Sequence, residues 1–279
     1  MWAYANFCGS AMPEVTAYAH GYPAWVELVT PDVRASQRFY RDLFGWDVYT
    51  LAGDLNDYSI FTLGGVQGPE VAGMEPLADD SMEPTWTCYF RTDDVQAALD
   101  RVLAMGGQEL SEPTDISNLG RMAHCADPEG ADFALWYPYD FQGAGVVDEP
   151  SAMCWMELAV RDVEGARRFY GEVFGWRAVD RSYLAPDYTN WKVGEWSVAG
   201  MVPLAEWWPA HSEPHWIPYF WVSDCDAAAA RAAVLGAVVH VPPTDIKAGR
   251  FAVMTDPCGA RLAVLTPAAG SRLTFRPHG

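Results

Sequence analysis

Residues 38–46 read Arg-Phe-Tyr-Arg-Asp-Leu-Phe-Gly-Trp, and residues 168–176 read Arg-Phe-Tyr-Gly-Glu-Val-Phe-Gly-Trp. The two stretches are nearly identical and lie 130 positions apart. A repeat at a fixed offset is the mark of a duplicated structural unit, so it governs how the rest of the chain is interpreted. A chain of 279 residues is also long enough for two domains.

The same offset recurs along the chain and sets the expected domain boundaries. The matching pairs are Trp25 and Trp155, Glu27 and Glu157, Phe90 and Phe220, Asp94 and Asp224, and residues 113–116 and 243–246. The Asp-Pro-x-Gly motif at 127–130 returns at 256–259, with an offset of 129. We therefore predict an N-terminal extension at 1–21, a first domain at 22–138, a linker at 139–151, a second domain at 152–267 and a C-terminal tail at 268–279.

Helix and strand signals alternate in the same order in each half. Asp32 and Asp94 stand where helix N-caps are expected, before predicted helices at 33–43 and 95–105 that end at glycines. Short segments of alternating apolar and polar residues follow, such as 58–62, 70–74, 121–125 and 131–137. The order of one strand, one helix and three strands, four times over, predicts an α+β fold of tandem βαβββ modules. The helices should cover the convex side of each curved mixed sheet and leave the concave side, or cup, open.

The composition excludes several classes of partner. Asp and Glu number 37 against 18 Lys and Arg, a net charge of −19 that argues against nucleic acid and anionic membrane surfaces. No run of 18 apolar residues predicts a membrane span, and residues 1–21 lack the regions of a signal peptide. The six cysteines show no paired spacing, so we expect free thiols in a cytoplasmic protein.

These motifs resemble those of the vicinal oxygen chelate superfamily, which includes glyoxalases, bleomycin-resistance proteins and extradiol dioxygenases. The resemblance rests on the Asp-Val helix start, the Phe-Tyr-x-x-x-Phe-Gly-Trp segment and the later Gly-Arg and Asp-Pro-x-Gly motifs, and it covers 22–138 and 152–267. The Trp-x-Glu-Leu start of both halves resembles two-module actinomycete members, some of which belong to antibiotic pathways, including those for anthracyclines. The resemblance implies the cup-shaped fold but leaves the activity open, because the superfamily mixes enzymes with drug-binding proteins.

The resemblance also implies where metal ligands would stand on the concave strands. Those positions hold Trp25 and Trp155, Thr87 and Ile217, and Ala134 and Ala263, with apolar segments at 71–74 and 198–201. None offers the imidazole, thiolate or carboxylate that such ions require, so we expect no resident metal and no other cofactor. An ion shared by Glu27 and Glu157 remains an alternative. His211 and His215 have a metal-like spacing, but Pro214 breaks any helix between them, which predicts a loop before a strand at Trp216.

Strand alternation predicts which side chains line the cups instead. The candidate ligand-binding residues are Trp25, Glu27, Tyr89, Trp136, Trp155, Glu157, Tyr219 and Trp221. Flat rings with small alanines between them suit a planar apolar ligand, and the two glutamates suit an ammonium or hydroxyl group. A structural ion pair of these glutamates with Arg91 or Arg261 is the alternative, and His124 is either structural or an acid or base.

The sequence therefore predicts metal-free binding of a planar aromatic small molecule of antibiotic or natural-product type, with a cationic group as one version of the hypothesis. The expected role is sequestration or resistance, or assistance to a biosynthetic enzyme such as a pathway oxygenase, and no catalytic residue is assigned. The alternatives are a metal-dependent or acid–base lyase, isomerase or dioxygenase, and a purely structural partner protein. A monomer and a homodimer are both compatible with the sequence.

Overall fold

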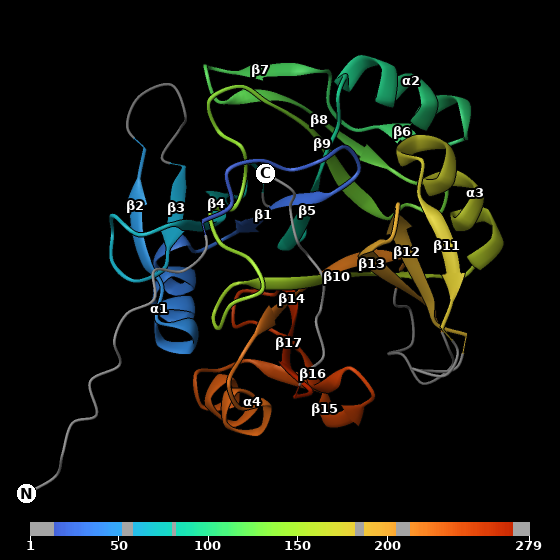
Figure 1. The fold of residues 1–279 in the computed structure, drawn as a ribbon. Helices are drawn as coiled ribbons and strands as arrows, with labels where there is room; N and C mark the ends of the chain where they lie inside the picture. Colours follow the sequence, from blue (N-terminus) through green and yellow to red (C-terminus); the bar gives the residue numbers. More distant parts are fainter. Residues whose placement is uncertain (1–13, 52–57, 80–81, 182–186, 205–212, 270–279) are drawn as a thin grey trace, which may run out of the picture.

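Each half of the chain forms one curved mixed sheet flanked by two helices (Figure 1). The computed structural model describes residues 14–51, 58–79, 82–181, 187–204 and 213–269. Residues 1–13 with Cys8, His211, and residues 270–279 of the predicted tail lie outside the described residues. The strand order is β2-β3-β4-β1-β5-β9-β8-β6 in the first sheet, with β7 beside β8, and β11-β12-β13-β10-β14-β17-β16-β15 in the second. This confirms the predicted α+β fold of tandem modules.

The order of elements agrees closely with the predicted one. The first half contains β1 (Pro23–Thr30), α1 (Val33–Phe44), β2 (Asp47–Thr50), β3 (Ser59–Thr62), β4 (Glu70–Pro76), β5 (Thr85–Arg91), α2 (Val95–Ala104), β6 (Gln108–Glu109), β7 (Thr114–Ile116), β8 (Gly120–Ala126) and β9 (Asp132–Pro138). The second half contains β10 (Met153–Val160), α3 (Val163–Phe174), β11 (Arg177–Asp180), β12 (Thr189–Val193), β13 (Trp196–Pro203), β14 (His215–Trp221), α4 (Cys225–Val234), β15 (Val238–Ile246), β16 (Gly249–Thr255) and β17 (Arg261–Pro267). The main departure is that the strand after α2 is divided into β6 and β7.

The aspartates that were expected to cap the helices do so. The side chain of Asp32 accepts a hydrogen bond from the backbone N–H of Ala35 at 2.9 Å, and Asp94 accepts one from Ala97 at 3.0 Å. Gly45 ends α1 in the left-handed conformation, with φ of 75°, which a residue with a side chain adopts only under strain. These local signals set the direction in which each helix leaves its strand.

The repeated Phe-Tyr-x-x-x-Phe-Gly-Trp segment joins the two halves. The hydroxyl of Tyr40 donates to Asp256 Oδ2 at 2.7 Å, and that of Tyr170 donates to Asp127 Oδ2 at 3.0 Å. Both aspartates belong to the Asp-Pro-x-Gly motif of the opposite half. The indole N–H of Trp46 likewise reaches the carbonyl of Ser151, at 2.7 Å. Two repeated motifs are therefore explained together, because the tyrosine of one motif binds the aspartate of the other motif across the contact between the halves.

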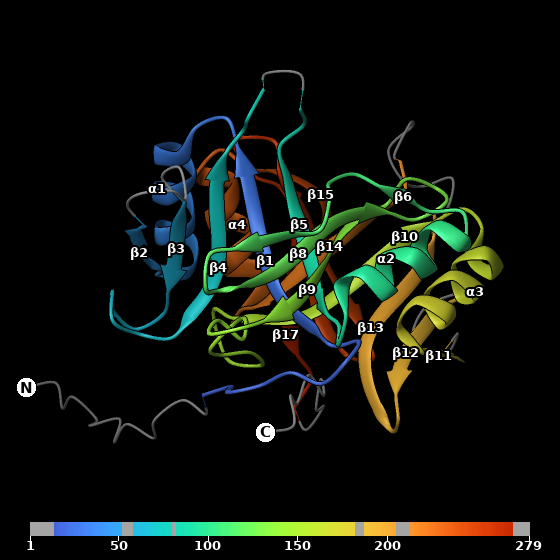
Figure 2. The ribbon, with the colours of Figure 1, turned by 90° about the horizontal axis from the view of Figure 1, so that it is seen from above.

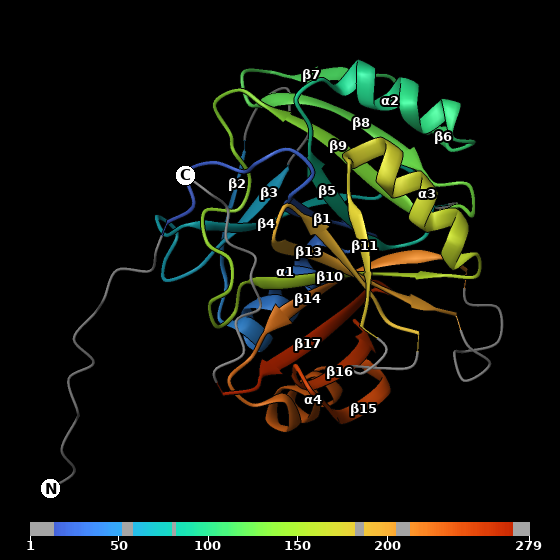
Figure 3. The same cartoon turned by 45° about the vertical axis from the view of Figure 1, so that its right-hand side comes forward.

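An aromatic core lies between the two sheets. The ring of Phe220 on β14 contacts Phe44 and Trp46 of the first half, and Phe90 on β5 contacts Phe174 of the second. Helix α1 lies beside α4, and α2 lies beside α3, so each helix pair combines the two halves (Figures 2 and 3). Because the helix-facing sides of the sheets pack together, the two concave faces point away from each other. No helix within the described ranges is long and apolar enough to cross a membrane.

Candidate functional site

A buried carboxylate stands at the centre of the first cup. Glu27 on β1 is 6% exposed, and its two oxygens accept hydrogen bonds from different tyrosines. The hydroxyl of Tyr89 donates to Oε1 at 2.8 Å, and that of Tyr58 donates to Oε2 at 2.5 Å. The indole N–H of Trp25 donates in turn to the Tyr58 hydroxyl, at 3.2 Å. We call these four residues the first glutamate cluster.

The second cup repeats this arrangement residue for residue. The hydroxyl of Tyr219 donates to Glu157 Oε1 at 2.7 Å, and Tyr188 also hydrogen-bonds to Glu157. The indole N–H of Trp155 donates to the Tyr188 hydroxyl at 3.0 Å. These four residues form the second glutamate cluster. A polar network kept in both halves is fully hydrogen-bonded, which is the condition for a buried carboxylate to be tolerated.

A glycine opposite each glutamate makes room for the tyrosine hydroxyl. Gly73 pairs with Glu27 across β1 and β4, and Gly200 pairs with Glu157 across β10 and β13. A Cβ atom on Gly200 would lie 2.0 Å from the hydroxyl oxygen of Tyr188, and one on Gly73 would lie 1.9 Å from that of Tyr58. Only glycine therefore allows the hydroxyl to reach the carboxylate.

Replacing Gly200 with alanine is expected to displace the Tyr188 hydroxyl and break its hydrogen bonds to Glu157 and Trp155. The free energy of unfolding should fall by roughly 1–3 kcal/mol, the scale of overpacking and of a buried polar group left unpaired. Chemical denaturation followed by tryptophan fluorescence measures this. Gly175→Ala is an informative control, because no atom crowds that site and only the positive φ disfavours alanine there. A Gly200→Ala variant as stable as the natural chain would contradict the described packing.

Burial makes both glutamates weaker acids than an exposed glutamate. It raises the pKa of Glu157 to about 7, while the hydrogen bonds from Tyr219 and Tyr188 act in the opposite direction. Burial also raises the pKa of Glu27. The neighbouring Glu75 has a pKa of about 7, because burial and then the charge of Glu27 disfavour its ionisation. A carboxyl group that exchanges its proton near neutral pH can donate or accept a hydrogen bond, and it can act as an acid or base.

The remaining candidate residues lie farther from the glutamates. Trp136 on β9 is 5% exposed, and its indole N–H donates to the carbonyl of Phe141 at 3.2 Å. The ring of Phe141 packs edge-on against Trp25, with centroids 4.9 Å apart. A residue from the predicted linker thus covers this side of the first cup. Trp221 lies half-buried at the end of β14, two residues beyond Tyr219, and does not join the second glutamate cluster.

Several alternatives from the sequence are wrong. Arg91 pairs with Asp93, and Arg261 donates to His215 Nε2 at 3.1 Å, so neither arginine forms the expected ion pair with a glutamate. His215 is the first residue of β14 and not part of a loop, because the strand begins directly after Pro214, one residue earlier than predicted. Glu27 and Glu157 lie in cups that face opposite ways, which excludes a shared ion.

Metal-ligating side chains do not converge in the part of the chain that the structure describes. Within it, no group of three or more His, Cys, Asp or Glu residues could hold an ion. His124 is near the first cluster, with Nε2 3.3 Å from the hydroxyl of Tyr89. Burial lowers its pKa, which favours the neutral imidazole. Cys88, Cys125, Cys154, Cys225 and Cys258 are free thiols.

The two tyrosines that precede β3 and β12 were missed by the sequence analysis. Tyr58 opens the predicted strand 58–62, but both tyrosines lie just before β3 and β12, where alternation no longer fixes the direction of a side chain. Their signal was the repeat itself, since Asp-Tyr occurs at 57–58 and again at 187–188 with the same 130-residue offset.

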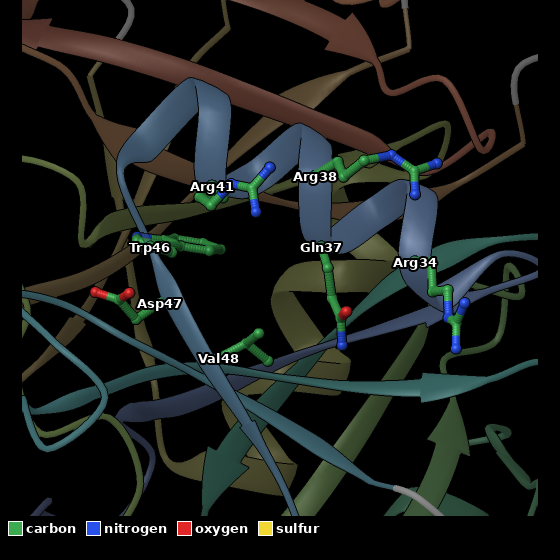
Figure 4. A pocket seen from close by; sticks show the side chains of 7 residues that line it. All are labelled: Arg34, Gln37, Arg38, Arg41, Trp46, Asp47 and Val48. Carbon is green, nitrogen blue, oxygen red and sulfur yellow. The ribbon is translucent and has the colours of Figure 1, made fainter.

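A separate hollow lies in the first half (Figure 4). Its volume is about 370 Å³, and it lies between α1 and β2. The lining residues are Arg34, Gln37, Arg38, Arg41, Trp46, Asp47 and Val48. It lacks the convergent buried polar groups that the cups provide, so we place the candidate site in the cups.

Comparisons with known proteins agree with the fold and the repeat. The family model of the Glyoxalase/Bleomycin resistance protein/Dioxygenase superfamily matches residues 23–135 and 152–264. The "Putative glyoxylase CFP32" of Mycobacterium tuberculosis is 40% identical over 89% of this chain and 96% of its own length. The "Anthracycline biosynthesis protein DnrV" of Streptomyces peucetius is 38% identical over 88% of this chain and 93% of its own length.

A solved structure shows the same fold at low identity. The Mn(II)-bound glyoxalase from Novosphingobium aromaticivorans superposes with a TM-score of 0.62 at 18% identity, covering 89% of this chain and 83% of that one. Two matching modules and relatives along nearly the whole chain decide the classification. The chain belongs to the Glyoxalase/Bleomycin resistance protein/Dioxygenase superfamily.

Proposed function

We propose that this chain binds a planar aromatic small molecule in a cup, without a resident metal. The observation that carries the proposal is the glutamate cluster itself, in which a buried carboxyl and two tyrosine hydroxyls stand beside a tryptophan. Oriented hydroxyls and aromatic faces are the groups that fix a flat ligand and its oxygen substituents. The positions where the superfamily resemblance implies metal ligands hold Trp25 and Trp155.

The biological role that we propose is sequestration of a natural product, or assistance to a biosynthetic enzyme such as an oxygenase of the same pathway. The similarity to a protein named for anthracycline biosynthesis supports a polycyclic aromatic ligand. We propose further that the protein acts in the cytoplasm as a monomer or a homodimer. A cationic ligand group fits the acidic first cup best, where Glu75 stands near Glu27.

Acid–base catalysis is a second candidate, supported by the raised pKa of Glu157. Its pKa of about 7 lets the carboxyl take a proton from a bound molecule and return it at neutral pH. Tyr219 and Tyr188 would hold the carboxyl in position while it changes charge. The same cluster would then serve as an isomerase or lyase site rather than as a binding site alone.

The test is a fluorescence titration of the full chain with anthraquinone-2-carboxylate and with the cationic anthracycline doxorubicin. Aromatic stacking on Trp25 or Trp155 should quench emission saturably, with a dissociation constant in the range of roughly 1–50 µM. Glu27→Gln and Glu157→Gln variants assign the quenching to one cup. No saturable quenching by either compound up to about 100 µM would reject the binding proposal.

Metal analysis separates this proposal from its metal-dependent rival. Protein purified without chelator should contain far less than one equivalent of Fe, Ni, Mn or Zn, because the described residues offer no cluster of suitable ligands. A stoichiometric transition metal that is lost on Glu157→Gln substitution would favour the rival.

A further inference from the structure

The two cups differ in charge along the row of residues that crosses each sheet at the glutamate. In the second cup Asn190 pairs with Gly200, Gly200 with Glu157, and Glu157 with Ile217. Tyr219 pairs with Ala263 in parallel register, which places Ile217 beside Arg261 two residues earlier. The second-cup row therefore reads Asn190, Gly200, Glu157, Ile217 and Arg261 across five adjacent strands.

The first cup has a different row at the same level. Its register gives Ile60, Gly73, Glu27, Thr87 and Asp132. Glycine and glutamate are kept, whereas both ends change. An asparagine replaces isoleucine at one end, and an arginine replaces aspartate at the other. The first cup thus presents carboxylates only, and the second presents one carboxyl facing a guanidinium.

Both ends of the second-cup row face the concave side. Trp191, the residue after Asn190, packs against Tyr170 on the helix-facing side, so the alternation of the strand turns Asn190 the other way. Arg261 contacts His215, which shares the face of Ile217 and Tyr219 on β14. Four strand spacings separate the ends, on the order of 19 Å along the sheet, a width suited to a fused-ring ligand.

Asn190 carries a buried acceptor to which no described residue donates. The residue is 8% exposed, and its Oδ1 has no hydrogen-bond partner among the described residues. An unpaired buried amide oxygen is rare in native proteins, because losing its hydrogen bond to water destabilises the fold. Its counterpart Ile60 has no polar atom to satisfy. The unpaired oxygen therefore points to a hydrogen-bond donor that arrives with a ligand.

Arg261 is half-buried, and the described residues provide no counter-ion for it. No Asp or Glu of the described part forms an ion pair with it, although the chain has a large acidic excess. Its guanidinium donates to the neutral acceptor His215 Nε2, whose other ring nitrogen donates to the carbonyl of Glu213. Burial lowers the pKa of Arg261, the direction expected for a guanidinium removed from water. An anionic group would supply that interaction.

We propose that the second cup binds a fused-ring aromatic ligand with an acidic oxygen on Arg261 and a hydroxyl group that donates to Asn190. This deepens the proposed function, on which it rests, by naming the ligand class of one cup. The acidic first cup, with Asp132 in place of Arg261, rejects the same ligand by charge repulsion. The two cups thus have opposite charge preferences, although each has an equivalent glutamate at its centre.

The test compares two matched probes by isothermal titration calorimetry. Anthraquinone-2-carboxylate should bind the natural chain at least roughly tenfold more tightly than the neutral anthraquinone-2-carboxamide, the scale of one charge-assisted hydrogen bond. Arg261→Gln should abolish this preference, and Arg261→Lys should restore part of it. Asp132→Asn, the matched change in the first cup, should leave the preference unchanged.

Asn190 is tested with a hydroxylated probe. Asn190→Leu should weaken the binding of 6-hydroxyanthraquinone-2-carboxylate, whose hydroxyl is on the ring far from the carboxylate, several-fold while sparing the probe without a hydroxyl. Thermal unfolding of each variant shows that it is folded. Equal affinity of the acid and the amide for the natural chain would overturn this inference and leave the proposed function standing. Absence of binding by every probe would reject both.

Discussion

Truncation of Phe220 to alanine is expected to lower the free energy of unfolding by about 3–5 kcal/mol, the usual cost of deleting a buried aromatic ring. Phe220 is fully buried, and its ring contacts Phe44, Trp46 and Trp86 of the other half. The cavity cannot collapse easily, because rigid rings from both sheets surround it. Urea denaturation monitored by circular dichroism gives the value.

The same experiment reports on the coupling of the two halves. Phe90 occupies the equivalent position, so Phe90→Ala should cost a similar amount, whereas the exposed Tyr137→Ala should cost less than about 1 kcal/mol. Since both rings pack across the contact between halves, we expect the natural chain to unfold in one transition. Two separated transitions, with Phe220→Ala shifting only one of them, would contradict the shared core.

Substitution of Glu157 by glutamine is expected to change how stability depends on pH. The carboxyl has a pKa near 4.5 when the chain is unfolded and about 7 when it is folded, chiefly because of burial. The unfolded chain therefore releases this proton first, and the stability contributed by the neutral carboxyl is full below pH 4.5 and lost as pH rises through 7. By pH 8 the loss should reach roughly 2–3 kcal/mol. Glu157→Gln removes this loss.

Denaturant titrations at pH 4.5 and pH 8 measure the effect. From pH 4.5 to pH 8, the free energy of unfolding of Glu157→Gln should rise by roughly 2–3 kcal/mol relative to that of the natural chain. Glu172→Gln, an exposed change on α3, should follow the natural chain at both values. If Glu157→Gln also followed it, the carboxyl would have to be ionised and solvated in the folded state, and its proposed role as an acid or base would fail.

Residue alternation was sufficient to place the two glutamates and their partners Tyr89 and Tyr219 on one face, but it did not find Tyr58 and Tyr188. Glu27 and Glu157 lie on the cup face because they alternate with residues that pack under the helices, and this depends only on strand geometry. Tyr58 and Tyr188 reach the carboxyls from the ends of connecting segments. Their direction depends on the room left by Gly73 and Gly200, a tertiary property that no local pattern encodes.

Local sequence patterns also do not predict the contacts between the halves. The nine-residue repeat identified the fold, yet its tyrosine acts by binding an aspartate 216 positions away, as Tyr40 binds Asp256. Phe141 illustrates the same limit, because a residue expected in a linker packs on Trp25 inside the first cup. The difference between the cups became visible only when strand register placed Asn190 and Arg261 in one row with Glu157.

A crystal structure of the full chain with anthraquinone-2-carboxylate tests the central claim most directly. We predict that the rings lie in the second cup beside Trp155 and Tyr219, with the carboxylate within hydrogen-bond distance of Arg261 and no metal ion between the ligand and Glu157. Density for the compound only in the hollow beside α1, or a metal ion bound by Glu157 in the second cup, would contradict it.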